Sequence, residues 1–353
     1  MMGKVKREIS IGSRTIGGGR PIAIQSMTNT VTADIDSTVR QIRVLTAAGC
    51  EIIRVTVPDW ESAAALGKIK QQINIPIVAD IHFDHRLAVA SIENGADKIR
   101  INPGNIGGRE KVAEVVKAAK ERNIPIRVGV NSGSLSRELY EKYGGATVKA
   151  MMEDLDRQVT MIEDMDYRNL VIAAKSSDIL NMVAINRVMH ERYDYPIHIG
   201  LTEAGTVFSG TIKSSAALAI LLEEGIGDTI RYSLTADPVN EVEAAKVLLR
   251  ALGLYKKGVN IISCPTCGRT KVDIIYIANE LEKRTRDLEI SLDVAVMGCG
   301  VNGPNEARHA DLGIAGGSDG ALLFKKGEII KKVTADEALD ELMVLINGFN
   351  RGD

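Results

Sequence analysis

The chain has 353 residues, of which 45% are hydrophobic and 25% charged, and its formal net charge is −2. This length exceeds one ordinary domain, and the composition is typical of a globular α/β protein. A net charge so close to zero argues against binding to nucleic acid or to a bilayer through a general electrostatic field, so we expect neither partner. Residues 1–10 lack the apolar segment of a signal peptide, and we expect a cytoplasmic protein without a membrane span.

Short aliphatic strands alternate with helical stretches along residues 1–255. The first helical stretch begins near Asp34 or Asp36 and ends at Gly49, a good helix terminator. Others are Lys111–Arg122 and Ser214–Glu224. The expected strands are Pro21–Thr28, Glu51–Val57, Pro76–Ile81, Lys98–Asn102, Pro125–Val130, Asn169–Lys175, Pro196–Leu201 and Thr229–Leu234.

Regular alternation of strand and helix predicts a parallel sheet, and eight such units over about 250 residues close a (β/α)8 barrel. The alternative is an open doubly wound sheet. It is disfavoured because no Gly-x-Gly-x-x-Gly follows the first strand. We therefore predict a TIM-barrel domain over residues 1–255.

Cationic side chains gather at the strand ends, where TIM barrels carry their active sites. Four arginines lie within strands, flanked mostly by aliphatic residues: Arg54, Arg100, Arg127 and Arg231. The two-residue alternation of a strand points each of them into the barrel, and Lys175 ends the sixth strand. Asp80 or Glu203 would pair with one arginine, which leaves an excess of buried positive charge. This excess predicts an anionic ligand, and guanidinium groups suit phosphate or diphosphate oxygens.

Residues 256–353 predict a small α+β domain. Strands Val259–Ser263 and Ser291–Met297 each lead into a cysteine turn, and Lys271–Lys283 and Asp336–Asn347 are expected helices. Asp311–Ala315 and Ala321–Lys325 are expected to form a hairpin, followed by an exposed turn at 325–327.

Three of the four cysteines lie in these turns. Cys264 and Cys267 have two residues between them, and Cys299 follows in the second turn. Three thiolates are one ligand short of a closed zinc site or an all-cysteine iron–sulfur cluster. Spacing alone favours an iron–sulfur cluster, with zinc completed by His309 as the alternative. A thioredoxin-like redox pair is less favoured because it needs no third cysteine.

Four motifs together carry a family resemblance. They are Cys-Pro-Thr-Cys-Gly-Arg-Thr (264–270), Met-Gly-Cys-x-Val-Asn-Gly-Pro-x-Glu (297–306), Ile-Gln-Ser-Met-Thr (24–28) and Asp-Ile-His-Phe (80–83). The chain closely resembles the bacterial 4-hydroxy-3-methylbut-2-en-1-yl diphosphate synthases of the methylerythritol phosphate route to isoprenoids. The resemblance covers the whole chain in the two-domain bacterial form.

The resemblance implies a [4Fe–4S] cluster held by Cys264, Cys267, Cys299 and the carboxylate of Glu306. It implies an oxidoreductase that opens the ring of 2-C-methyl-D-erythritol 2,4-cyclodiphosphate and removes water, using two single-electron transfers. Flavodoxin or ferredoxin would be the electron donor. It also implies a homodimer in which the cluster domain of one chain caps the barrel of the other.

Family roles follow for the strand-end residues. The resemblance assigns diphosphate binding to Arg54, Arg100, Arg127, Asn131, Lys175, Arg231 and Ser233, and places Asn302 on the substrate from the cluster side. It puts Asp80, His82, Thr202 and Glu203 near the reacting carbons, and our hypothesis is that Glu203 donates the proton as hydroxide leaves. Two rivals are a metal-sensor module without chemistry and a pterin-binding or other phosphate-handling barrel enzyme whose second domain holds structural zinc.

Overall fold

The computed structural model describes residues 5–300, 307–317 and 320–349. The chain divides into two compact units, Met1–Leu254 and Tyr255–Asp353, which are described separately. No helix among the described residues is long and apolar enough to cross a membrane.

The first unit is built on eight parallel strands in the order β8-β7-β6-β5-β4-β3-β10-β9. A single bridge between Ile172 and Ile197 joins β8 to β9 and nearly closes the barrel. This confirms the predicted (β/α)8 architecture. The strands are β3 (Ala23–Met27), β4 (Ile52–Thr56), β5 (Ile77–Asp80), β6 (Lys98–Arg100), β7 (Ile126–Asn131), β8 (Leu170–Lys175), β9 (His198–Ile199) and β10 (Thr229–Ile230).

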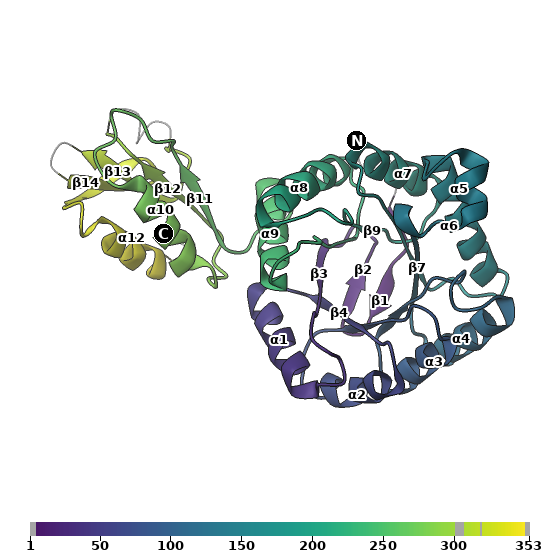
Figure 1. The fold of residues 1–353 in the computed structure, drawn as a ribbon. Coiled ribbons are helices and arrows are strands. Elements are labelled where there is room, and N and C mark those ends of the chain that lie inside the picture. The colour runs from purple at the N-terminus through teal and green to yellow at the C-terminus, as the bar shows by residue number, and fades with distance from the viewer. Residues whose placement is uncertain (1–4, 301–306, 318–319, 350–353) are drawn as a thin grey trace. The chain divides into compact units, whose positions relative to one another are not determined.

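The helices of this unit form a ring outside the strands (Figure 1). Helix α1 shows how the sequence sets their ends. Asp34 accepts a hydrogen bond from Ser37 N at the start, and Gly49 ends the helix with φ 111°. The ring comprises α1 (Ile35–Ala48), α2 (Trp60–Lys70), α3 (His85–Glu93), α4 (Arg109–Arg122), α5 (Arg137–Tyr143), α6 (Val148–Glu163), α7 (Ile179–Arg192), α8 (Val207–Glu223) and α9 (Pro238–Ala251).

A short antiparallel hairpin, β1 (Ile9–Ile11) with β2 (Arg14–Ile16), precedes the barrel. Its isoleucines pack against Ile52, Val78 and Val171, which lie toward the amino ends of their strands or inside the barrel. The hairpin therefore covers the end of the barrel opposite the strand ends that carry the cations. The strands predicted from the sequence begin at Pro21, so this hairpin was not predicted.

The second unit is a five-stranded mixed sheet in the order β11-β12-β13-β14-β15. Its strands and helices are β11 (Val259–Ser263), α10 (Ile274–Thr285), β12 (Leu292–Met297), β13 (Leu312–Gly317), β14 (Gly320–Lys325), β15 (Glu328–Val333) and α12 (Ala338–Asn347). Both helices pack on the sheet through residues such as Leu281 and Leu342, which join Val294 and Ile314 in one apolar core.

Two expectations for this unit need correction. Helix α10 begins at Ile274 rather than Lys271, because Lys271 N donates a hydrogen bond to Gly298 O and Asp273 caps the helix instead. The predicted hairpin β13–β14 is confirmed, but the chain turns again and adds β15 as an edge strand. Strand β15 is exposed along almost its whole length, so it lacks the alternation of apolar and polar residues that would reveal it.

Candidate active site

A cavity of about 340 Å³ lies at the carboxyl ends of the barrel strands. Of the predicted barrel residues, all but Glu203 line it: Arg54, Asp80, His82, Arg100, Arg127, Asn131, Lys175, Thr202, Arg231 and Ser233. Glu203 lines an adjoining cavity of about 410 Å³, which shares Arg231 and Ser233 with the first. We call the two the main cavity and the side cavity. Two further predicted residues, Asn302 and Glu306, lie outside the described residues.

Asp80 is the anionic centre of the main cavity. The register of the parallel strands places it beside Arg100 on β6, and Arg100 beside Arg127 on β7. Its carboxylate accepts a hydrogen bond from Arg100 Nη1 at 3.1 Å and lies 3.5 Å from Arg54 Nε. Burial raises the pKa of Asp80, but the neighbouring Arg54 and Arg100 outweigh it and bring the pKa to about 2. Asp80 is thus an anion at neutral pH, shared between two guanidinium groups.

Arg127 and Lys175 have no such compensation. Both are buried, and neither forms an ion pair with a carboxylate of the described residues. The Nε and Nη1 atoms of Arg127 are buried without a hydrogen-bond partner there. Burial lowers the pKa of each group well below its ordinary value, and the repulsion of the other cations lowers it further. Such a site is electrostatically incomplete until an anion enters it.

A further cation lies deeper in the barrel. Lys98, on β6, is completely buried, and its Nζ is 3.4 Å from Gln25 Oε1. Burial lowers its pKa well below the ordinary value, with Arg127 and Arg54 adding repulsion. The sequence analysis did not single out Lys98, because it stands at the first position of its strand and its distance from the strand end gave no functional signal.

Strand β3 supports the cations without contributing one. Met27 Sδ accepts hydrogen bonds from Arg54 Nε at 3.1 Å and Nη2 at 2.9 Å. Gln25, two residues earlier on the same face of the strand, contacts Lys98. Both belong to the 24–28 motif quoted for the family resemblance, which was the signal available for them. Asn102, Asn105 and Ser134 also line the main cavity and were missed.

Gly200 makes room for the site. A Cβ at this position would lie 2.3 Å from Arg231 O and 3.0 Å from Lys175 Nζ. Any larger residue would therefore displace the backbone that carries Arg231 or the ammonium group of Lys175.

Glu203 has a left-handed backbone, with φ 54°. This region is uncommon for residues other than glycine and costs free energy unless the surrounding structure holds it. Backbone hydrogen bonds fix the chain on both sides of Glu203: Thr202 N donates to Ser176 O, and Thr235 N donates to Gly205 O. The ion pair expected between an arginine and either Asp80 or Glu203 is made by Asp80.

The cysteine turns of the second unit lie at one end of its sheet. Strands β11 and β12 are parallel neighbours with Ser263 opposite Val296, so Cys264 and the residues before Cys299 emerge side by side. Gly298 N donates to Cys264 Sγ at 3.2 Å, and Lys271 N donates to Gly298 O at 2.8 Å. Backbone N–H groups directed at sulfur are a recurring feature of iron–sulfur sites.

The described residues contain no group of three His, Cys, Asp or Glu side chains close enough to hold a metal. The segment that would complete the ligand set, 301–306, lies outside them. His309, the alternative zinc ligand, is exposed and lies beside Arg308, with 3.4 Å between Arg308 Nε and His309 Nε2. An arginine in that position disfavours a cationic ligand site at His309.

The class of protein that these features define is a TIM-barrel protein with a cationic cavity at its strand ends and a separate domain that carries two cysteine turns. The chain belongs to the GcpE family: residues 6–246 match the GcpE TIM-barrel domain, and residues 260–348 match the GcpE protein C-terminal domain. The family resemblance carried by the four motifs is thereby confirmed.

Curated relatives match nearly the whole chain. A protein of Caldicellulosiruptor saccharolyticus is 59% identical over 96% of this chain and 97% of its own length. One of Caldanaerobacter subterraneus subsp. tengcongensis is 55% identical over 97% of this chain and 96% of its own. Both relatives are named 4-hydroxy-3-methylbut-2-en-1-yl diphosphate synthase (flavodoxin).

Two solved structures of other enzymes resemble about 71% of the chain. A Burkholderia cenocepacia dihydropteroate synthase aligns with a TM-score of 0.52 and 16% identity, over 71% of this chain and 96% of that chain. A Leptospira borgpetersenii sialic acid synthetase aligns with a TM-score of 0.50 and 14% identity, over 71% of this chain and 89% of that chain. At such low identity the likeness supports the TIM-barrel fold and says nothing about the ligand.

Proposed function

We propose that this protein catalyses the reductive ring opening and dehydration of 2-C-methyl-D-erythritol 2,4-cyclodiphosphate. The product would be 4-hydroxy-3-methylbut-2-enyl diphosphate, an intermediate of isoprenoid biosynthesis. The observation that carries the proposal is the uncompensated charge of Arg127 and Lys175 in the main cavity. A cyclic diphosphate supplies the missing negative charge, and the product named by the relatives retains that diphosphate.

In this proposal the barrel residues have two kinds of role. Arg54, Arg100, Arg127, Asn131, Lys175, Arg231 and Ser233 hold the diphosphate, and Asn302 reaches the substrate from the cluster side. Asp80, His82 and Thr202 lie near the reacting carbons. Asp80 stays ionised because its pKa is about 2, so it orients Arg54 and Arg100 and does not act as an acid.

Glu203 is the proposed proton donor to the departing oxygen. Two observations support this role: Glu203 lines the side cavity together with Arg231, and its strained backbone is typical of functional positions. Glu203→Gln should therefore lower kcat at least about 100-fold while metal content stays unchanged. Glu223→Gln, an exposed carboxylate on α8, is the matched control. Full turnover of Glu203→Gln would show that another group supplies the proton.

A [4Fe–4S] cluster is the proposed cofactor, with Cys264, Cys267, Cys299 and Glu306 as ligands. The fit rests on the two cysteine turns emerging from neighbouring strands and on the N–H of Gly298 directed at Cys264 Sγ. When bound, the cluster supplies electrons one at a time. The relatives' names support flavodoxin as the donor, and ferredoxin is the alternative.

We also propose a homodimer in which the second unit of one copy covers the barrel mouth of another. Apolar side chains project from the segments that follow the barrel strands: Trp60, Phe83, Leu180 and Phe208, each more than half exposed. Phe83 and Phe208 are about four-fifths exposed, which is costly for a surface that stays open to water. A cytoplasmic location is part of the same proposal, since thiolate ligands need a reducing compartment.

The first experiment is to measure iron, acid-labile sulfide and zinc in protein purified without oxygen, and then to assay turnover of the cyclodiphosphate with a one-electron reductant. About four iron and four sulfide per chain, with turnover, would support the proposal. Zinc without sulfide, and no turnover, would favour the rival reading of a phosphate-handling barrel with a structural metal domain.

A further inference from the structure

Glu241, in the first turn of α9, is a buried carboxylate with no role in the function proposed above. It is 5% exposed. Its Oε1 accepts a hydrogen bond from Leu234 N at 3.0 Å, and its Oε2 accepts one from Ser26 Oγ at 3.4 Å. Oε2 is also 3.5 Å from Arg231 Nε. The contacts come from β3, from the residue after β10 and from the loop beyond it.

Burying a carboxylate costs free energy that its contacts must offset. Here two hydrogen bonds, from Leu234 N and Ser26 Oγ, fix the carboxylate beside Arg231, the arginine that lines both cavities. Arg231 Nε lies 3.5 Å from Oε2 as an ion pair, without a hydrogen-bond partner among the described residues. Arg231 lines both cavities, whereas Glu241 lines the side cavity alone. Glu241 therefore does not line the main cavity, and the residue of that cavity with which it forms an ion pair is Arg231.

An arginine side chain has many rotamers, and holding its planar guanidinium group in one orientation removes an entropic cost of binding. Asp80 does this for Arg54 and Arg100 from inside the main cavity. Glu241 occupies the equivalent place for Arg231, from outside that cavity.

We propose that Glu241 is a positioning residue, which holds the guanidinium group of Arg231 toward the main cavity so that it meets a phosphate oxygen. The inference rests on the proposed function only in taking a diphosphate as the ligand. It goes beyond that function by giving a role to a side chain behind the ligand site.

A purely electrostatic role and a positioning role of Glu241 predict opposite changes in the diphosphate affinity of Glu241→Gln. If Glu241 only neutralised Arg231, the uncharged Glu241→Gln variant would bind a diphosphate more tightly, since a negative charge near the ligand is gone. If Glu241 positions Arg231, the same variant binds more weakly, because the guanidinium group loses its fixed orientation. The sign of the change therefore separates the two roles.

The test measures binding of inorganic pyrophosphate to the full-length holoenzyme by calorimetry. We expect Glu241→Gln to weaken binding about tenfold, which corresponds to ~1.4 kcal/mol. In turnover we expect KM for the substrate to rise while kcat changes little, as for a group that acts through binding. Glu224→Gln is the matched control, because Glu224 pairs with Arg187 at the surface between α7 and α8, outside both cavities. It should bind like the wild type.

A double-mutant cycle makes the test specific. In an Arg231→Gln background, Glu241→Gln should have no further effect on pyrophosphate binding, since the group it positions is absent. Tighter binding by Glu241→Gln, or an additional loss in the Arg231→Gln background, would overturn the inference.

Two checks keep the outcome unambiguous. Ser26→Ala removes one contact to Glu241 without touching a charge, and we expect a smaller loss of pyrophosphate affinity in the same direction; unchanged or tighter binding by a folded Ser26→Ala variant would count against positioning. This variant stands in if Glu241→Gln does not fold. A wild-type protein that binds no pyrophosphate would remove the diphosphate ligand and with it both proposals, whereas normal wild-type binding with an unaffected Glu241→Gln variant would remove this inference alone.

Discussion

Arg127 illustrates how the main cavity lowers the stability of the folded protein. The side chain is 4% exposed, and two of its nitrogen atoms have no hydrogen-bond partner among the described residues. Arg54 and Arg100 repel its charge, and Asp80, which pairs with those two arginines, attracts it without forming an ion pair with it. A buried unpaired cation destabilises the folded state unless a ligand compensates it. We infer that Arg127 destabilises the ligand-free protein and serves to bind an anion.

Replacing Arg127 by methionine should therefore separate stability from function. Arg127→Met is expected to raise the free energy of unfolding of the ligand-free protein by about 1–4 kcal/mol, since an apolar side chain of similar length removes the buried charge. Pyrophosphate binding should be lost. Denaturant unfolding and calorimetry measure the two effects.

The control is Arg20→Met, which removes an exposed arginine paired with Glu8. It should change stability by no more than about 0.5 kcal/mol and leave binding intact. A destabilised Arg127→Met variant would mean that groups of the protein itself compensate the charge of Arg127, so that no ligand is needed to do so.

At the residue scale, the sequence could predict the cations but not their supports. An arginine between aliphatic neighbours in a strand has a clear meaning, because alternation points it into the barrel. Met27 and Glu241 carry no such signal. A methionine in a strand is normally core filler, and a glutamate in the first turn of a helix is normally a favourable charge at the helix end. The register of β3 and β4 pairs Met27 with Arg54, and the folded position of α9 brings Glu241 to Arg231.

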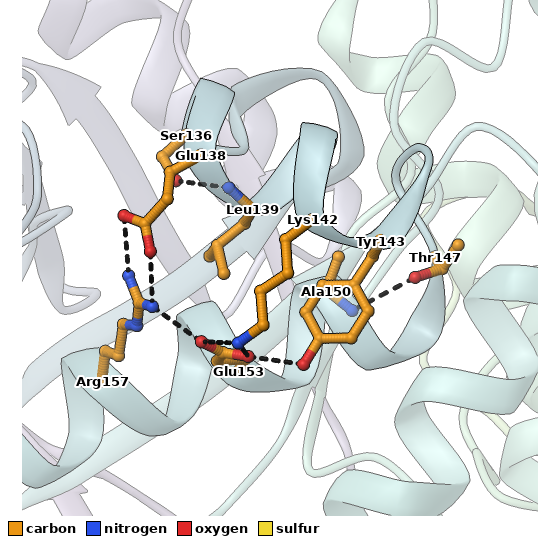
Figure 2. Close-up of polar contacts among 9 residues, drawn as sticks. All are labelled: Ser136, Glu138, Leu139, Lys142, Tyr143, Thr147, Ala150, Glu153 and Arg157. Atoms are coloured by element: carbon orange, nitrogen blue, oxygen red, sulfur yellow. Dashed lines mark hydrogen bonds and ion pairs between the residues drawn. The ribbon is translucent and has the colours of Figure 1, made fainter.

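Among the elements, α5 is the one whose position depends most on polar contacts. It follows the short 3-10 turn Ser132–Ser134, and Ser134 lines the main cavity. Only Leu139 of this helix is buried. Figure 2 shows what holds it against α6: Glu153 of α6 accepts hydrogen bonds from Lys142 Nζ at 2.7 Å and from Tyr143 Oη at 2.5 Å, and Arg157 Nη2 of α6 donates to Glu138 Oε1 of α5 at 2.9 Å.

Glu153→Gln should loosen α5 without unfolding the barrel. The hydrogen bonds from Lys142 and Tyr143 lower the pKa of Glu153 to about 2 in the folded protein, below its ordinary value of 4.5. The carboxylate therefore contributes stability above about pH 4.5, and this contribution is lost as the pH falls towards 2. Amide hydrogen exchange in α5 should be faster in the variant at neutral pH, and the difference should shrink as the pH is lowered from 5.

Glu141→Gln is the matched control for this prediction. Glu141 lies on α5 itself and pairs with Arg137 of the same helix, so its ion pair does not join α5 to α6. Its removal should leave the exchange of α5 nearly unchanged. Equal effects of the two substitutions would show that the charge of α5 matters rather than its attachment to α6.

At the element scale, the strand–helix alternation predicted the barrel, but three segments escaped it. The β1–β2 hairpin is made of three-residue strands, which are too short for a periodic pattern. Strand β15 is almost fully exposed and has no pattern to read. Helices α5 and α6 lie between β7 and β8, in the longest interval between barrel strands. There the sequence predicted a longer connection but not its two helices.

For the whole molecule, the division into two units separates anion binding from the cysteine turns. All the cations of the main cavity belong to Met1–Leu254, and the core of the second unit is built from its own residues. A fragment of residues 1–254 should therefore bind pyrophosphate with a dissociation constant within about threefold of the full chain, a difference of ~0.6 kcal/mol. It should have no turnover.

Calorimetry on the fragment, after circular dichroism has established that it is folded, makes this measurement. A folded fragment that fails to bind would show that residues of the second unit complete the anion site. The sequence could predict two domains, because the cysteine motifs begin where the strand–helix alternation ends. It could not predict how much each domain contributes to the affinity for the ligand, because that affinity depends on side chains that come together only in the folded barrel.

The hairpin β1–β2 has a consequence for the order of events in a catalytic cycle. It packs isoleucine side chains into the barrel end opposite the cavity, so among the described residues the strand-end mouth is the route left for exchange with solvent. Incoming substrate and outgoing product must then share one route. Whatever covers that mouth during the reaction has to withdraw once per turnover, which makes opening and closing, and not bond breaking alone, a natural limit on the pace of the enzyme.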